Sequence, residues 1–351
     1  GFISLVITAF VYACKYWILH GVFGQIEADV MHHADVYLLI VTASIPFIAL
    51  YNGGAAIFRA MGNSEVSMKV SLLMNAINVS GNAILIYGFH CGTEGVAIPT
   101  LVSRFVAAFI IIKLLLKDKW TLHLERTFRF NPDWSMIRKI LSVGIPNGLE
   151  NSMFQLGKVL VLSLVSTFGT YAIAANAVSN VITLFSILPG QAICLAVTTV
   201  IARCVGAGDY EQAKYYNKKL ILLTHIGMAI TIFIVFITLP FILKVYNLSE
   251  AASEATRHII WFHGCCAILI WAESFTLPAT FRACGDAKAC MIISTVSMWI
   301  FRVGASYILG KNLGLGVFGV WVAMIIDWAF RSLLFGIRYF SGKWKKHALV
   351  S

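Results

Sequence analysis

Several side chains able to bind an ion or a ligand lie within one apolar segment, residues 138–165. An α-helix turns by about 100° per residue, so these side chains share one helix face within an arc of about 100°. They are Asn147, Glu150, Asn151, Phe154 and Lys158. A carboxylate kept from water can exchange a proton near neutral pH, or can hold Na⁺ or an organic cation. We therefore predict a functional role for Glu150. The alternative is that Glu150 and Lys158, about 12 Å apart along the helix, neutralise partners on other helices.

Two further apolar segments carry polar side chains of the same kind. Glu273 lies midway along residues 257–281 and precedes Pro278. A carboxylate there can meet a cation or the backbone amides that a proline frees, and an ordinary ion pair is the alternative. Asn176, Asn180 and Gln191 lie in residues 171–202. Such amides either line a cavity or form hydrogen bonds between helices, and the sequence leaves both roles open.

A charge network is predicted near the C-terminus. Asp327 and Arg331 share one face of residues 315–339, and Arg302 lies in the preceding segment, 289–309. A charged side chain in hydrocarbon costs at least about 2.5–3.5 kcal/mol, so each of these residues needs a partner or a function. We expect a structural network in which Asp327 bonds to Arg302 or Arg331, with proton or ion coupling as the alternative.

The elements that carry these residues are predicted to cross a membrane. Hydrophobic residues make up 59% of the 351 residues and charged residues 12%, and the mean hydropathy is +0.82. Soluble domains average roughly 45–50% apolar and about 25% charged residues, which excludes a soluble enzyme. A spanning helix needs roughly 20 apolar residues. Ten segments qualify: 2–23, 36–58, 69–89, 95–117, 138–165, 171–202, 218–243, 257–281, 289–309 and 315–339. The predicted fold class is an all-α polytopic membrane protein.

Basic residues are concentrated in alternate loops between these segments. One set of loops, together with the C-terminal end, holds 19 Lys and Arg residues, whereas the opposite set holds Lys244, Arg257 and Lys311. By the positive-inside rule the basic set and the C-terminus are cytoplasmic, which indicates a cell (plasma or inner) membrane protein and argues against nucleic-acid binding. We predict a partial N-terminal lobe at 1–120, a basic inter-lobe loop at 121–136, a C-terminal lobe at 137–342 and a tail at 343–351.

An internal repeat supports two related lobes. The sequence FRAMGN at 58–63 returns 223 residues later as FRACGD at 281–286, and Gly95-Val96 returns as Gly319-Val320. Repeats in the same orientation imply two lobes related by an axis along the membrane normal. The second half has six predicted spans and the first has four. We therefore expect a twelve-helix, 6+6 bundle that lacks its first two spans ahead of Gly1, with a natural ten-span chain as the alternative.

These motifs, in this order, resemble the multidrug and toxic compound extrusion (MATE) family. The resemblance rests on the duplicated turns, on residues 144–158, on VGAGD at 205–209 and on residues 327–344. It implies two six-helix lobes around a central cavity, which export cationic or aromatic organic compounds across the membrane in exchange for H⁺ or Na⁺. The expected partners are small organic substrates and the lipid bilayer. We also expect a monomer with no cofactor beyond the coupling ion.

No motif indicates catalysis or a metal centre. The sequence contains no HExxH, GxSxG or phosphate-binding loop, and its eight cysteines show no CxxC spacing. An intramembrane enzyme is therefore the least favoured alternative. A lipid-linked oligosaccharide flippase of related architecture is the other alternative. It would need a strongly cationic cavity for pyrophosphate, and the sequence offers few intramembrane Arg and Lys residues.

Overall fold

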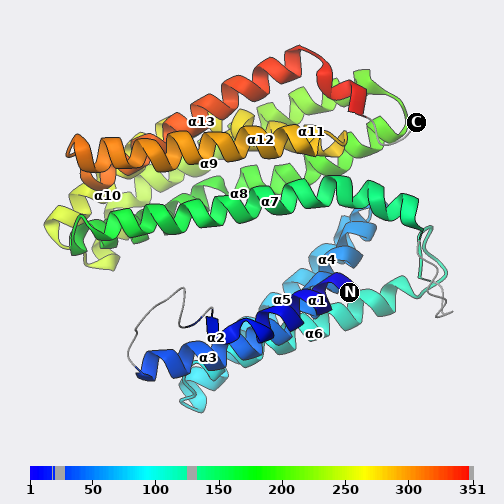
Figure 1. Cartoon of the computed structure of the whole chain (residues 1–351), viewed down its shortest axis with the longest axis horizontal. Helices are drawn as coiled ribbons and strands as arrows, with labels where there is room; N and C mark the ends of the chain where they lie inside the picture. Colours follow the sequence, from blue (N-terminus) through cyan, green and yellow to red (C-terminus); the bar gives the residue numbers. More distant parts are fainter. Residues whose placement is uncertain (18, 20–27, 125–132, 348–351) are drawn as a thin grey trace. The chain divides into compact units, whose positions relative to one another are not determined.

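The computed structural model describes residues 1–17, 19, 28–124 and 133–347. Every regular element in that part of the chain is a helix, which confirms the all-α fold class. The chain divides into two compact units, Gly1–Phe130 and Asn131–Ser351. Figure 1 shows the helices of each unit, coloured along the sequence.

The first unit is built around helix α6. In chain order it contains α1 (Phe2–Ala13), α2 (Lys15–Trp17), α3 (Ala28–Ala43), α4 (Ile45–Ala60), α5 (Ser64–Ala83), the π-helical turn η2 (Ile84–Gly88) and α6 (Glu94–Leu115). Helices α3, α4 and α5 all pack against α6. A Cβ atom at Gly54 would lie 2.8 Å from the Ile111 side chain, so glycine allows α4 to approach α6 closely. The Asn78 amide donates to the Thr100 hydroxyl at 3.0 Å and joins α5 to α6.

The second unit holds every predicted site residue. Its elements are α7 (Trp134–Ser166), α8 (Thr170–Gly206), α9 (Tyr210–Tyr246), α10 (Glu250–Trp271), η3 (Ala272–Thr276), α11 (Leu277–Ala283), α12 (Ala287–Ser297), η4 (Met298–Gly304), η5 (Tyr307–Asn312), α13 (Gly316–Phe340) and η6 (Lys343–His347). Helix α8 packs against α9, α10 and α11, while α7 packs against α12 and η4. The core between α10 and α13 is aromatic, with Trp271, Trp321 and Trp328 almost fully buried. The turns η3, η4 and η5 are π-helical.

The two copies of the repeated hexapeptide fold in the same way. Each ends a helix with a glycine at positive φ, 83° at Gly62 and 87° at Gly285. The residue after each glycine donates its backbone N–H to the carbonyl of Phe58 or Phe281, at 2.9 and 2.8 Å. This is the closing hydrogen bond of a Schellman motif, which glycine adopts without strain. Both phenylalanines are fully buried, so the repeated sequence specifies a packed helix end.

Eight helical spans in the described part of the chain are long and apolar enough to cross a membrane, whereas the sequence predicted ten. They are Asp29–Ala60, Ser64–Gly88, Glu94–Leu115, Thr170–Gly206, Tyr210–Tyr246, Glu250–Ala283, Ala287–Asn312 and Gly316–Phe340. Two of the predicted spans, 2–23 and 138–165, are not among these eight. Within 2–23 the first helix ends at Ala13, and residues 18 and 20–23 lie outside the described residues. Residues 138–165 do form a helix, but the polar side chains of α7 lower its hydropathy.

Candidate functional site

Three carboxylates of the second unit lie away from the ends of its spans, and each is held by a basic side chain. They are Glu150 on α7, Glu273 on η3 and Asp327 on α13. In all three, one oxygen is in a hydrogen bond, whereas the other is buried without a partner among the described residues. Buried polar atoms are nearly always satisfied, so a free carboxylate oxygen is a place where a proton or a cation can bind.

Glu150 forms an ion pair with Arg282, which lies at the end of α11. The guanidinium Nη2 donates to Glu150 Oε1 at 2.7 Å, and the exposed fractions of the side chains are 11% for Glu150 and 26% for Arg282. The structure therefore places Glu150 in the ion-paired arrangement that the sequence treated as the alternative. Because the guanidinium already compensates its charge, Glu150 has little need of a further cation inside a span. Sequence reasoning missed this partner, which is 132 residues away.

Glu273 pairs with His225 on α9. The ring atom Nε2 lies 2.9 Å from Glu273 Oε1, and Nδ1 lies 2.6 Å from the carbonyl oxygen of Ile268. Neutral imidazole has only one N–H, so the two contacts require either a protonated ring beside a carboxylate or a neutral ring beside a protonated carboxyl group. Either way, the pair holds one proton more than neutral histidine with ionised glutamate. The π-helical turn η3 carries Glu273, and such turns are frequent at functional sites.

Asp327 is the most enclosed of the three carboxylates. Its side chain is fully buried, and Oδ1 accepts hydrogen bonds from Arg331 Nε at 2.9 Å and from the Ser297 hydroxyl. Arg331 Nη2 also donates to the carbonyl oxygen of Ser294 at 3.2 Å, which ties α13 to α12. The structure thus gives Asp327 one of its two predicted partners, Arg331, within the same helix. No hydrogen bond joins Asp327 to Arg302 in the described residues.

Three cations surround the ring of Phe154. Lys158 Nζ lies 5.0 Å from the ring centroid, Arg302 Cζ lies 5.2 Å away and Arg331 Cζ lies 5.4 Å away. We call Phe154, Lys158, Arg302 and Arg331 the Phe154 cluster. Arg302 lies in the π-helical turn η4. Within the described chain neither Lys158 nor Arg302 forms an ion pair. The aromatic face attracts these cations without neutralising them.

The predicted amide residues have different surroundings. They are Asn147, Asn151, Asn176, Asn180 and Gln191. Asn176 is buried, and its Oδ1 accepts a hydrogen bond from Trp321 Nε1 at 3.1 Å, so this amide joins α8 to α13. Asn151 and Asn180 are exposed, and each donates to the carbonyl oxygen four residues earlier in its own helix at 2.8 Å. Asn147 is half-buried and Gln191 is exposed.

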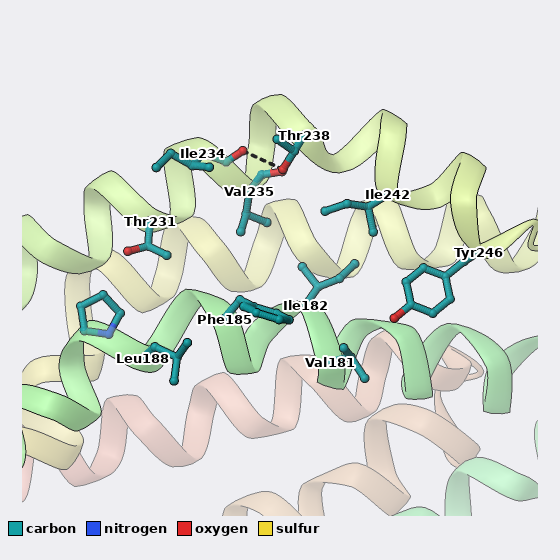
Figure 2. A pocket seen from close by; sticks show the side chains of 11 residues that line it. Val181, Ile182, Phe185, Leu188, Thr231, Ile234, Val235, Thr238, Ile242 and Tyr246 are labelled. Atoms are coloured by element: carbon teal, nitrogen blue, oxygen red, sulfur yellow. Dashed lines mark hydrogen bonds between the residues drawn. The ribbon is translucent and has the colours of Figure 1, made fainter. Parts of the chain in front are cut away.

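An apolar groove of about 600 Å³ lies between α8 and α9, as Figure 2 shows. Phe185 lines it from α8 and Val235 from α9. The hydroxyls of Thr231 and Thr238 donate to carbonyl oxygens of their own helix, so they are not free for a ligand. Apart from the Tyr246 hydroxyl at one end, the lining offers only hydrocarbon contacts. The groove suits an apolar group and contains none of the predicted polar site residues.

The cysteine and histidine side chains do not form a metal site in the part of the chain that the structure describes. No group of three or more His, Cys, Asp or Glu side chains there could hold a metal ion. All eight cysteines are free. Half-buried Cys194 has ordinary neighbours, its Sγ lying 3.5 Å from the Thr276 hydroxyl.

Comparison with known proteins shows which family has this arrangement. A family model described as MatE matches residues 1–84 and 146–308, more than half of the chain. The chain belongs to the MatE family. The probable multidrug resistance protein NorM of Thermotoga maritima is 26% identical to this MatE protein over 339 residues, which covers 95% of the chain and 72% of NorM. The uncharacterized transporter YisQ of Bacillus subtilis is 28% identical over 352 residues, covering 98% and 75%.

A solved structure supports the same fold for this MatE protein. The outward-facing conformation of a multidrug resistance MATE family transporter of the MOP superfamily aligns with a TM-score of 0.88 and 20% identity, covering 98% of this chain and 78% of that one. The chain is therefore a multi-pass membrane transporter with the two-lobe fold, and it is not an enzyme. The expectation that two spans are missing ahead of Gly1 is not confirmed by these matches.

Proposed function

We propose that this MatE protein is a secondary antiporter that exports small organic compounds in exchange for H⁺ by alternating access. The observation that carries the proposal is the His225–Glu273 pair, in which both ring nitrogens face acceptor atoms. Relatives named as multidrug resistance proteins support organic compounds as the cargo. A plasma or inner membrane location, a cytoplasmic C-terminus and a monomeric state belong to the same proposal.

The His225–Glu273 pair can carry the coupling proton because one proton changes its net charge. With the proton bound, the pair is neutral in total, as imidazolium with carboxylate or as imidazole with carboxylic acid. Without it, the pair bears one negative charge, which costs at least about 2.5–3.5 kcal/mol inside a span. Proton binding therefore favours a conformation in which the pair is closed to water, and proton release favours one in which the pair is hydrated. Such a difference in affinity between two states is what drives a transport cycle.

The other two carboxylates have supporting roles in this scheme. Arg282 compensates Glu150, and Arg331 compensates Asp327, so both pairs are already neutral without a proton or Na⁺. Their buried free oxygens make Na⁺ binding the alternative form of coupling. A Na⁺ gradient tests that alternative directly.

Transport in proteoliposomes tests the proposal. The purified chain is reconstituted with carboxyfluorescein or ethidium as the cargo, under an imposed pH gradient, an imposed Na⁺ gradient or no gradient. We expect the pH gradient to drive at least one dye, and we expect Glu273→Gln to abolish that transport. Glu254→Gln, which alters an exposed carboxylate on α10, is the matched control and should transport normally. Transport driven by Na⁺ alone would overturn proton coupling, and no transport with either gradient would overturn antiport.

The lipid-linked oligosaccharide flippase is the second candidate, because Lys158 and Arg302 leave positive charge inside the second unit. Pyrophosphate carries several negative charges, however, and the cluster leaves only two cations uncompensated. A fluorescent polyprenyl-pyrophosphate sugar in the same proteoliposomes distinguishes the two functions. Its movement between leaflets without any gradient would favour the flippase, and its retention in one leaflet would exclude that function.

A further inference from the structure

The charges inside the helices of the second unit do not balance. Its three intramembrane carboxylates each have a basic partner of their own. Two cations, Lys158 and Arg302, are left over.

The first unit offers no carboxylate midway along a described span. Glu65 and Glu94 lie at helix beginnings, and Asp29 and Asp35 lie in the first quarter of the span Asp29–Ala60, where Asp35 pairs with Lys15 at 2.8 Å. In the first unit Arg104 lies midway along α6 and donates to the Ser44 hydroxyl at 2.6 Å, without an ion pair among the described residues. The described spans therefore hold three uncompensated cations at mid-span, of which the second unit contributes two, Lys158 and Arg302.

The position of these cations excludes a lipid headgroup as their usual partner. Arg302 is ten residues from the end of its span at Asn312, and Lys158 is eight residues from the end of α7 at Ser166. At a rise of 1.5 Å per residue, these are depths of about 15 and about 12 Å, close to the middle of a 30 Å hydrocarbon core. A phosphate in a headgroup does not reach that depth.

No carboxylate among the described residues of the second unit forms an ion pair with either cation. The negative charge of Asp327 attracts Arg302, but the positive charge of Arg331 repels it. Contact with the Phe154 ring is worth about 0.5–2 kcal/mol per cation, less than the cost of a bare charge in hydrocarbon. Lys158 is exposed and Arg302 is half-buried, so an anion can reach both. Intramembrane charges of this kind face a water-filled cavity or a partner.

We propose that the Phe154 cluster binds the anionic group of the exported compound, so that the substrates are organic anions such as carboxylates or sulfonates. This inference rests on the export function proposed above and changes the expected substrates from cationic or aromatic compounds to organic anions. Charge-assisted hydrogen bonds from Arg302 and Lys158 hold the anion. The Phe154 ring, which lies against both cations, contacts the apolar body of the compound.

Equilibrium binding to the purified full chain in detergent tests the assignment independently of transport. Carboxyfluorescein is the anionic aromatic probe and ethidium is the cationic one, with fluorescence anisotropy as the readout. We expect carboxyfluorescein to bind more tightly than ethidium. Arg302→Gln should weaken its binding by about tenfold, which is 1.4 kcal/mol, and Lys158→Gln by about threefold. Arg302→Lys should restore part of the loss.

The matched control is Lys311→Gln, which removes a cation from the same span at an exposed position in η5. This variant should bind carboxyfluorescein as the unaltered chain does. Equal binding by the Arg302→Gln and Lys311→Gln variants would overturn the proposal, as would tighter binding of ethidium. If Arg302→Gln fails to elute as a single folded species, the exposed Lys158→Gln variant decides the outcome.

The two proposals fail in different ways. Binding of carboxyfluorescein through Arg302, without transport under any gradient, would remove the antiport function and keep the anion site. Proton-driven transport of ethidium, without binding of carboxyfluorescein, would remove the anion site and keep antiport.

Discussion

The guanidinium of Arg282 lies 2.7 Å from Glu150 Oε1, although the two residues are 132 positions apart in the sequence. Arg282 belongs to the repeated hexapeptide, whose first copy has Arg59 at the matching position. Arg59 Nη1 instead donates to the Ser67 hydroxyl at 3.1 Å, within its own unit. The two copies therefore share a backbone turn but give their arginines different partners, and only the second copy compensates a carboxylate within a span.

Breaking the Glu150–Arg282 pair is expected to destabilise the protein. Glu150→Gln leaves a mostly buried guanidinium without an anion, at a cost of about 3 kcal/mol. The double variant Glu150→Gln with Arg282→Gln removes both charges and should lose less stability than the two single variants together. Thermal unfolding of the unaltered chain, the two single variants and the double variant in detergent completes this double-mutant cycle. Additive losses would mean that the two side chains do not interact.

The Asp327 network is expected to be more sensitive still, since both charged side chains are almost fully buried. Asp327→Ala leaves the buried Arg331 guanidinium without an anion, whereas the Ser297 hydroxyl keeps the backbone carbonyl of residue 327 as an acceptor. We expect a loss of about 4 kcal/mol. Ser297→Ala removes one donor and should cost only about 1 kcal/mol. Thermal unfolding ranks the variants, with Glu254→Ala as a surface control. Equal melting temperatures for the Asp327→Ala and Glu254→Ala variants would contradict the network.

The sequence predicts the helix face of α7 well but not the partners of its residues. The spacing of Glu150, Phe154 and Lys158 depends only on helical periodicity, which is a local property. The ion pairs join residues 48 and 132 positions apart, and nothing in the periodicity selects His225 or Arg282 from the other basic residues. Their common signal is a charge in or next to an apolar segment, which shows that a partner is needed without showing which one.

The sequence likewise did not predict that Arg302 lacks an ion-pair partner. The sequence offers Asp327 two arginine partners, Arg331 on the same helix face and Arg302 in the preceding span. The structure satisfies Asp327 with Arg331 four residues later, where a helix brings side chains together. Arg302 sits in the π-helical turn η4, whose wider winding changes the direction of its side chain relative to an α-helix. Such turns have no simple sequence pattern.

Removing His225 is expected to change how transport depends on pH. His225→Gln keeps a polar side chain beside Glu273 but cannot take up a proton, so we expect the dependence of transport on pH to flatten. His258→Gln alters an exposed histidine on α10 and should leave the profile unchanged. Initial rates of dye transport in proteoliposomes between pH 5 and 8, the range in which histidine titrates, give both profiles. Identical profiles for the two variants would show that His225 takes no part in coupling.

The repeated dipeptide, Gly95-Val96 and Gly319-Val320, places glycine where a larger side chain would be crowded. A Cβ atom at Gly319 would lie 2.8 Å from the backbone carbonyl of Leu309, and one at Gly95 would lie 3.1 Å from Cys91 Cβ. Backbone atoms cannot turn aside as a flexible side chain does, so Gly319→Ala must push α13 away from η5. We expect a loss of about 1–3 kcal/mol in thermal unfolding. Gly336→Ala, on the same helix with open space around it, should be neutral or gain up to about 1 kcal/mol from higher helix propensity. If Gly319→Ala lowers thermal stability and Gly336→Ala does not, the repeated glycine is needed for the close approach of α13 to η5. Equal changes in stability for the two variants would refute this.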